Sequence, residues 1–89
     1  MQELKARMPR YFFHYWNGIG LEEDYEGLEL ADVDAAPVRA LNMATEILEH
    51  REDLPPQTRE ASAFEIVDEA GHIVLFVPLS EAEEGTNLR

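Results

Sequence analysis

Histidines and clustered acids are the residues in this 89-residue chain whose side chains could do chemistry. The three imidazoles, His14, His50 and His72, could hold zinc only if two of them came close together. His14 and His72 would meet if the strands that carry them paired side by side. Packing of His14 among neighbouring aromatic residues is the simpler interpretation, so we predict no metal site and no cofactor.

The densest acidic stretch runs from Glu22 to Asp34 and holds seven carboxylates in thirteen residues, with no basic side chain. Such a run could bind a cation or dock a basic partner. The segment Asp24-x-Glu26-Gly27 has the glycine turn of a calcium loop but lacks the remaining ligands at their fixed spacing. We therefore expect a solvated acidic face here.

Nucleophilic catalysis finds little support in the sequence. The serines and threonines lack the local context of an activated nucleophile, and no glycine-rich phosphate loop is present. The absence of cysteine excludes disulfides, thiolate zinc sites and thiol catalysis. We predict that the protein is not an enzyme.

The overall charge narrows the class of partner. Nineteen acidic residues against seven basic ones give a net charge of −12, which repels phosphate backbones and anionic lipid. Neither nucleic acid nor a membrane is expected as a partner, and no apolar run approaches the roughly 20 residues needed to span a bilayer. The N-terminal residues lack the pattern of a signal peptide, so the expected location is the cytoplasm.

These side chains must be positioned by a sheet that begins with the aromatic stretch Tyr11–Trp16, which holds five of the eight aromatic residues. Aromatic side chains favour a buried strand. Asn17-Gly18 predicts a hairpin turn after it, and Asp24–Gly27 predicts a second tight turn. Residues 21–24 should fold back along the first strand, and residues 28–30 should be extended again after the second turn.

One amphipathic helix follows. We place its N-cap at Asp34, because Pro37 then falls in the first turn, with an irregular turn from Asp32 as the alternative. The helix should end between Arg51 and Asp53, before Pro55-Pro56. Its predicted apolar stripe consists of Ala36, Ala40, Met43, Ala44, Ile47 and Leu48.

The remaining chain predicts a surface loop over 55–60, a strand over 61–67, a turn over 68–71 and an apolar strand over 72–77. The fold class is therefore α+β, in the order ββαββ, with one helix packed on a four-stranded, mostly antiparallel sheet. With the four predicted strands numbered in chain order, we expect the spatial order 2-1-4-3, which places the first and last strands at the centre of the sheet. A single domain should cover residues 9–79, with a flexible arm at 1–8 and a frayed acidic tail at 80–89.

Several of these segments together resemble a known family. Pro9–His14, Asn17-Gly18, Asp24–Asp32, the alanine-rich helix and Phe64–Gly71 occur in the order typical of short bacterial proteins of unknown function, abundant in rhizobia and related alphaproteobacteria. The resemblance covers roughly residues 9–78. It implies no established activity and no catalytic residues to transfer.

The faces of the sheet suggest self-association. In the first and last strands, alternate residues are apolar on both faces, yet one helix can cover only one face. Either the N-terminal arm and the tail fold over the other face, or a second copy covers it. We predict the second case, a homodimeric, non-enzymatic interaction protein. The predicted interaction residues are Tyr11, Phe13, Tyr15, Trp16, Glu22, Glu23, Asp24 and Glu26.

Two other functions stay open at this stage. The acidic stretch Glu22–Asp34 could make the protein a regulatory or antitoxin-like adaptor that neutralises a basic protein partner. Alternatively, His14 and nearby acids could serve a small-ligand site or an enzyme. Loss of a co-purified basic protein at high salt would favour the first, and a deep pocket at His14 would favour the second.

Overall fold

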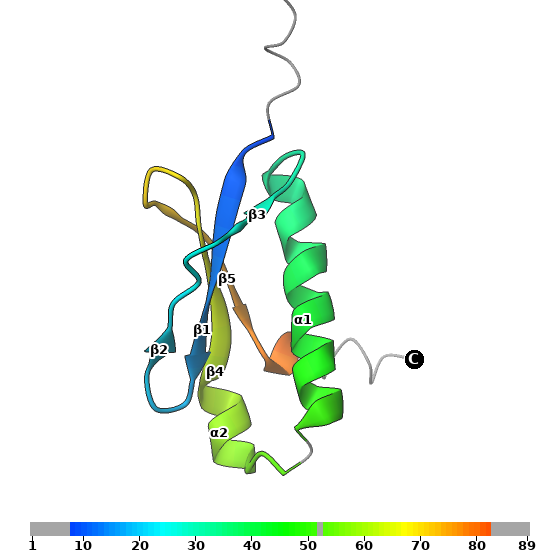
Figure 1. The fold of residues 1–89 in the computed structure, drawn as a ribbon. Coiled ribbons are helices and arrows are strands. Elements are labelled where there is room, and N and C mark those ends of the chain that lie inside the picture. The colour runs from blue at the N-terminus through cyan, green and yellow to red at the C-terminus, as the bar shows by residue number, and fades with distance from the viewer. Residues whose placement is uncertain (1–7, 52, 83–89) are drawn as a thin grey trace, which may run out of the picture.

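The computed structural model describes residues 8–51 and 53–82, which fold into a helix layer on a sheet layer (Figure 1). The predicted α+β class, with one main helix on a mostly antiparallel sheet, is confirmed. No helix among these residues is long and apolar enough to cross a membrane. The strands and helices are β1 (Arg10–Asn17), β2 (Leu21–Glu22), β3 (Leu28–Glu29), α1 (Ala36–His50), α2 (Pro56–Ala61), β4 (Ser62–Val67) and β5 (Ile73–Pro78).

The sheet is antiparallel in the order β2-β1-β4-β5, and β3 also pairs with β1. Strands β2 and β3 share one edge of β1, because Tyr15 lies opposite Glu22 and Tyr11 lies opposite Leu28. The chain between Glu22 and Leu28 is longer than the strand segment that it faces. The excess bulges out as an irregular segment, residues 23–27, which we call the acidic loop.

The predicted strand order is wrong in one respect. The strand at 62–67, not the last strand, lies beside β1, and β5 lies at the edge of the sheet. The last strand is apolar from Ile73 to Pro78, whereas β4 contains Glu65. In the structure the Trp16 indole N–H donates to the Glu65 carboxylate over 3.1 Å, so the acid is accommodated in a central strand.

The core lies between the sheet and α1. Large sheet side chains such as Phe13, Phe64 and Ile66 are buried there, and the ring centroids of Tyr15 and Phe64 are 5.0 Å apart. Opposite them, α1 presents small side chains at spacing four, which lets the helix approach closely. The predicted apolar stripe is confirmed, since its members Ala36, Ala40, Ala44, Met43, Ile47 and Leu48 are buried in this core or packed against it.

The start of the helical region and the loop after it differ from the sequence-based predictions, whereas α1 ends at His50 with Arg51 as its C-cap, at the start of the predicted range. Asp32, not Asp34, provides the cap: its side chain accepts the Asp34 N–H over 3.0 Å and begins a 3-10 turn at Val33–Ala35 that leads into α1. The preceding prediction of an irregular turn from Asp32 describes this arrangement. The predicted surface loop at 55–60 contains α2, which begins at Pro56 because proline suits a first helical turn.

The predicted terminal segments lie mostly outside the described residues. Of the arm at 1–8, only Met8 is described, and it is exposed. Of the tail at 80–89, residues 80–82 are described, and Ala82 is buried in the core beside the fully buried Leu79.

Candidate functional site: an acidic groove and an apolar sheet face

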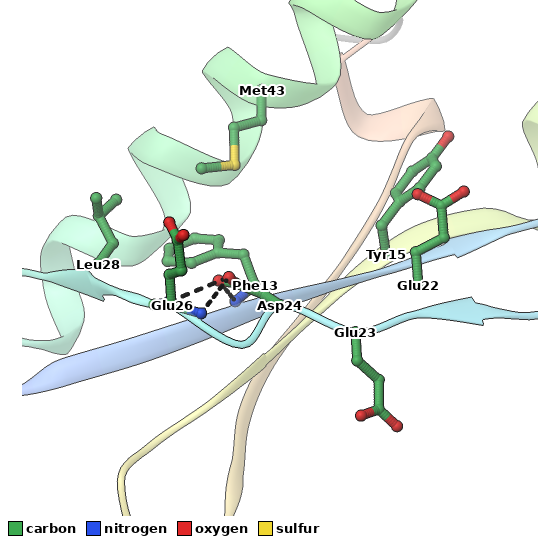
Figure 2. A pocket seen from close by; sticks show the side chains of 9 residues that line it. Phe13, Tyr15, Glu22, Glu23, Asp24, Glu26, Leu28 and Met43 are labelled. Atoms are coloured by element: carbon green, nitrogen blue, oxygen red, sulfur yellow. Dashed lines mark hydrogen bonds between the residues drawn. The ribbon is translucent and has the colours of Figure 1, made fainter.

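A groove of about 400 Å³ opens between α1 and the acidic loop (Figure 2). Phe13 and Tyr15 of β1, Leu28 of β3 and Met43 of α1 supply its apolar lining. Alternation along β1 turns Phe13 and Tyr15 to the helix side of the sheet, and Met43 extends from α1 toward them in Figure 2. The remaining lining residues belong to β2 and the acidic loop, namely Glu22, Glu23, Asp24, Glu26 and Gly27.

Gly27 gives the acidic loop its path. Its φ is +73°, a left-handed conformation that side chains with a Cβ rarely adopt. A Cβ at this position would lie 2.7 Å from Arg10 Cγ and 2.9 Å from Phe12 Cε2, distances shorter than normal contact. The close approach lets the chain return to pair with β1, so that Leu28 reaches its place opposite Tyr11.

Asp24 fastens the acidic loop to β1. Its Oδ2 accepts the Phe13 N–H over 3.0 Å, and its Oδ1 accepts the N–H groups of Glu26 and Gly27 over 3.1 Å each. Partial burial acts to raise the pKa of Asp24, but the backbone donors, led by Phe13 N–H, outweigh it and lower the pKa below its ordinary value. The carboxylate is therefore ionised at neutral pH and held in place.

The other acids of the groove are more exposed. Asn17 donates its side-chain N–H to Glu22 over 2.7 Å. The Tyr25 hydroxyl donates to Glu23, and this hydrogen bond to a carboxylate raises the pKa of Tyr25. In Figure 2, Glu22 and Glu26 project to the helix side of the sheet, whereas Glu23 points the other way. Glu22 and Glu26 therefore form the rim of the groove.

The opposite face of the sheet carries a second surface, which we call the outer face. Strand register places its residues in three rows across β1, β4 and β5. All of these residues are apolar except His14 and Glu65 in the middle row. The rows are Phe12–Val67–Ile73, His14–Glu65–Phe76 and Trp16–Ala63–Pro78.

Large side chains of the outer face are open to solvent. Ile73 is 62% exposed, Phe76 54% and Trp16 37%. Helix α1 lies along the other side of the sheet (Figure 1). The acidic loop meets the outer face at Phe12 and His14, whereas Ile73 and Phe76 stay open to solvent. A contiguous apolar patch of this kind is unusual on a soluble monomer and commonly marks an association surface.

The structure divides the predicted interaction residues between several environments. Tyr11 is buried in the core, and Trp16 belongs to the outer face. The other six, Phe13, Tyr15, Glu22, Glu23, Asp24 and Glu26, meet at the groove.

The predicted interaction residues omit several residues of these two surfaces. In the groove these are Gly27, Leu28 and Met43, and on the outer face they include Ile73 and Phe76. Alternation along the last strand was the available signal for Phe76, but it places Ile73 on the opposite face. The register shift at Ile66/Val67 brings Ile73 to the same face as Phe76, and no sequence pattern indicated that shift. No local pattern pointed to Met43 as a groove residue, because its spacing in α1 is that of an ordinary core position.

The histidines are dispersed. His14 Nδ1 accepts the Asp24 N–H over 2.9 Å, whereas His50 Nδ1 lies 2.9 Å from the Glu46 carbonyl oxygen. Because β4 separates β1 from β5, His14 and His72 do not lie on paired strands. Within residues 8–51 and 53–82, no group of three or more histidines and acids is arranged to hold a metal ion.

His72 belongs to a separate turn between β4 and β5. Its backbone N–H donates to Asp68 Oδ1 over 2.9 Å and is the main cause that lowers the pKa of Asp68. The Ala70 N–H adds a second hydrogen bond of 3.0 Å to the same oxygen. The imidazole Nδ1 lies 3.6 Å from Asp68 Oδ2, close enough for an ion pair when the ring is protonated. This turn is exposed and serves the hairpin, not the groove.

Comparison with known proteins gives one match. Residues 10–80 fit the model of a family described as "Domain of unknown function (DUF6894)". Searches of curated proteins and of solved structures returned no match.

Proposed function

We propose a function from the surfaces of the molecule, because the chain belongs to the DUF6894 family, whose description names no activity. The protein is a non-enzymatic interaction module that self-associates through the outer face of its sheet. The single observation that carries this proposal is the exposure of Ile73, Phe76 and Trp16 on the side away from α1. The resemblance to proteins of rhizobia and related alphaproteobacteria and the cytoplasmic location stay predictions.

Charge distribution favours a second copy as the occupant of the outer face. The chain carries a net charge of −12, so two copies repel wherever their acidic surfaces meet. The three rows of the outer face contain one carboxylate, Glu65, and the Trp16 indole already donates to it. Glu23 points to the same side from the acidic loop, beyond these rows. Two like-charged molecules can therefore approach here at the lowest electrostatic cost. A basic partner would gain more from the acidic loop than from this face.

The free edge of β5 is less suited to association than the face. The Leu79 N–H bonds to the Ser62 carbonyl over 3.0 Å, so the alternation of the ladder turns the backbone groups of Phe76 and Pro78 outward. Pro78 has no N–H to offer, and a register shift at Ile66/Val67 bends the other end of the strand. We therefore propose face-to-face packing of two sheets, with the α1 helices on the outside.

The histidine and acid beside β1 support a non-enzymatic role. His14 Nδ1 is occupied by the Asp24 N–H, and the Asp24 carboxylate accepts three backbone N–H groups. Both side chains thus maintain the acidic loop, and neither is held ready for proton transfer. His14 also lies outside the lining of the groove.

Light scattering at micromolar concentration tests the proposal. The wild-type chain should have twice the mass of one chain, and Phe76→Thr should shift the population toward a single chain. Threonine is chosen because it retains a preference for strands. The matched control is Val38→Thr on α1, where Val38 is 60% exposed but lies away from the outer face. This control should leave the mass unchanged.

Trp16 offers a second readout, because it is the only tryptophan and lies on the outer face. Dilution should shift its fluorescence emission to the red as the face becomes wet, and Ile73→Thr should produce the same shift without dilution. Circular dichroism checks that each variant is folded. A wild-type chain of single mass at all concentrations, with unchanged Trp16 emission, would contradict self-association.

A further inference from the structure

We propose that the groove binds a short, basic, extended segment of a partner protein. An apolar side chain of that segment rests on the floor, and lysine or arginine side chains lie beside Glu22 and Glu26. This inference does not depend on self-association. The groove lies on the α1 side of the sheet, so it stays open when the outer face is covered.

The floor of the groove accounts for the apolar side chain. Phe13 is almost fully buried, while Leu28 and Met43 are partly buried and close the two sides. Figure 2 shows the Met43 thioether above the Phe13 ring, with Leu28 at one end and Tyr15 at the other. A flexible methionine adapts to side chains of different shape and is common at surfaces that bind varied partners. A strongly hydrated ion would gain nothing from such a floor.

The rim accounts for the basic side chains. Glu22 lies opposite Tyr15, and Glu26 lies two residues before Leu28, which is opposite Tyr11. The strand distance from Tyr15 to Tyr11 is about 13 Å at the usual rise per residue, and Glu26 lies within this span, beside Phe13 in Figure 2. An extended peptide of five residues spans the groove in about four residue steps. Its central apolar residue would then lie between two long basic side chains that can reach back to Glu22 and Glu26.

The charge of the rim is not balanced by the described part of the molecule. No described basic side chain forms an ion pair with Glu22, Glu23 or Glu26. The Arg10 guanidinium bonds to the Glu26 carbonyl oxygen and, over 2.9 Å, to the Glu29 carboxylate. The complementary ligand is therefore cationic at its ends and apolar at its centre, which is the character of a basic peptide segment.

The test is an NMR titration of the full chain with the capped peptide Arg-Ala-Leu-Ala-Arg. Saturable shifts should appear at the methyl groups of Leu28 and Met43. The double variant Glu22→Gln/Glu26→Gln should weaken binding by about 3- to 10-fold, the range expected for two solvent-exposed ion pairs. The matched control, Glu49→Gln/Glu60→Gln, removes the same charge from exposed helix positions and should leave the affinity almost unchanged.

Three outcomes would overturn the proposal. Equal weakening by both double variants would mean diffuse attraction to the net charge. Equal affinity for Arg-Ala-Ser-Ala-Arg would mean that the floor takes no part. Spermidine that binds the groove as tightly as the peptide would assign the site to a polyamine. Phe76→Thr should retain peptide binding, so the failure of self-association and the failure of the groove are distinguishable.

Discussion

Asp24 shows how one side chain can replace a missing piece of strand. Opposite the acidic loop, β1 has no strand partner on that edge, so the Phe13 N–H would lose its ladder acceptor. Asp24 Oδ2 takes the place of a backbone carbonyl at 3.0 Å, and the Asp24 N–H in turn bonds to His14. A buried or half-buried donor without a partner costs more than one hydrogen bond contributes. The acid that helps to form the groove is therefore also structural.

Asp24→Asn should lower the free energy of unfolding at neutral pH by about 1 kcal/mol, since the amide cannot accept all three N–H groups and the site is partly solvated. The lowered folded pKa of Asp24 gives a stability contribution that is fully present above about pH 3.8. It is lost as pH falls below 3.8 through the folded pKa. The difference between wild type and variant should therefore shrink at acidic pH.

Urea unfolding, followed by Trp16 fluorescence, measures this difference between about pH 7 and pH 3. This range extends below the ordinary pKa of an Asp carboxyl group. Glu49→Gln on the exposed side of α1 is the control and should show no such trend. A difference between wild type and Asp24→Asn that stayed constant over the whole range would show that ionisation of Asp24 does not stabilise the loop.

At the scale of elements, α1 contributes small side chains to the core and the sheet contributes large ones. The helix contributes alanines with no exposed surface at positions 36, 40 and 44, and the sheet contributes aromatic rings and Ile66. Small residues at this spacing set the separation between helix and sheet. That separation also determines where Met43 lies above Phe13, so the depth of the groove depends on side chains that do not line it.

Ala40→Leu should destabilise the fold by about 1–3 kcal/mol, because the larger side chain must push α1 away from the sheet. Asn42→Leu is the control: Asn42 is an exposed position on the same helix, and leucine is a good helix former there. Thermal unfolding followed by circular dichroism measures both. Equal melting temperatures for the two variants would mean that the core has room at position 40.

Much of the fold could be predicted from the sequence because its signals are local. The aromatic run, the Asn17-Gly18 turn and the stripe on α1 each specify an element without reference to the others. The order of β4 and β5 could not be predicted in this way, since either strand of a hairpin can lie beside β1. The β1–β4 ladder, whose six register pairs run from Phe12↔Val67 to Asn17↔Ser62, joins residues far apart in the chain.

The candidate site was accessible to prediction only in part. The acids Glu22, Glu23, Asp24 and Glu26 are adjacent in sequence, so their clustering was evident. Their partner on the helix, Met43, is brought to them by packing. The separation of Trp16 from the groove follows from strand alternation, which turns neighbouring side chains to opposite faces.

At the scale of the whole molecule, the two proposed surfaces lie on opposite sides of the sheet and differ in charge. The groove has an acidic rim, whereas the outer face holds a single carboxylate among apolar side chains. Salt should therefore act on them in opposite directions, because it screens attraction at the groove and repulsion between two acidic copies at the outer face.

Raising the ionic strength from about 0.01 M to about 1 M shortens the Debye length from about 30 Å to about 3 Å. We expect this change to strengthen self-association and to weaken binding of the Arg-Ala-Leu-Ala-Arg peptide, each by several-fold. Sedimentation and the NMR titration, repeated across the salt series, measure the two effects. A parallel response of both equilibria would mean that they share one surface.

The proline and the register shift in β5 also limit how large an assembly can grow. A strand whose outward hydrogen bonds are interrupted at both ends is a poor template for adding further chains. The outer face is no longer accessible to a third chain once a second copy covers it. Growth should therefore stop at a closed pair, and concentrated solutions should stay free of fibres.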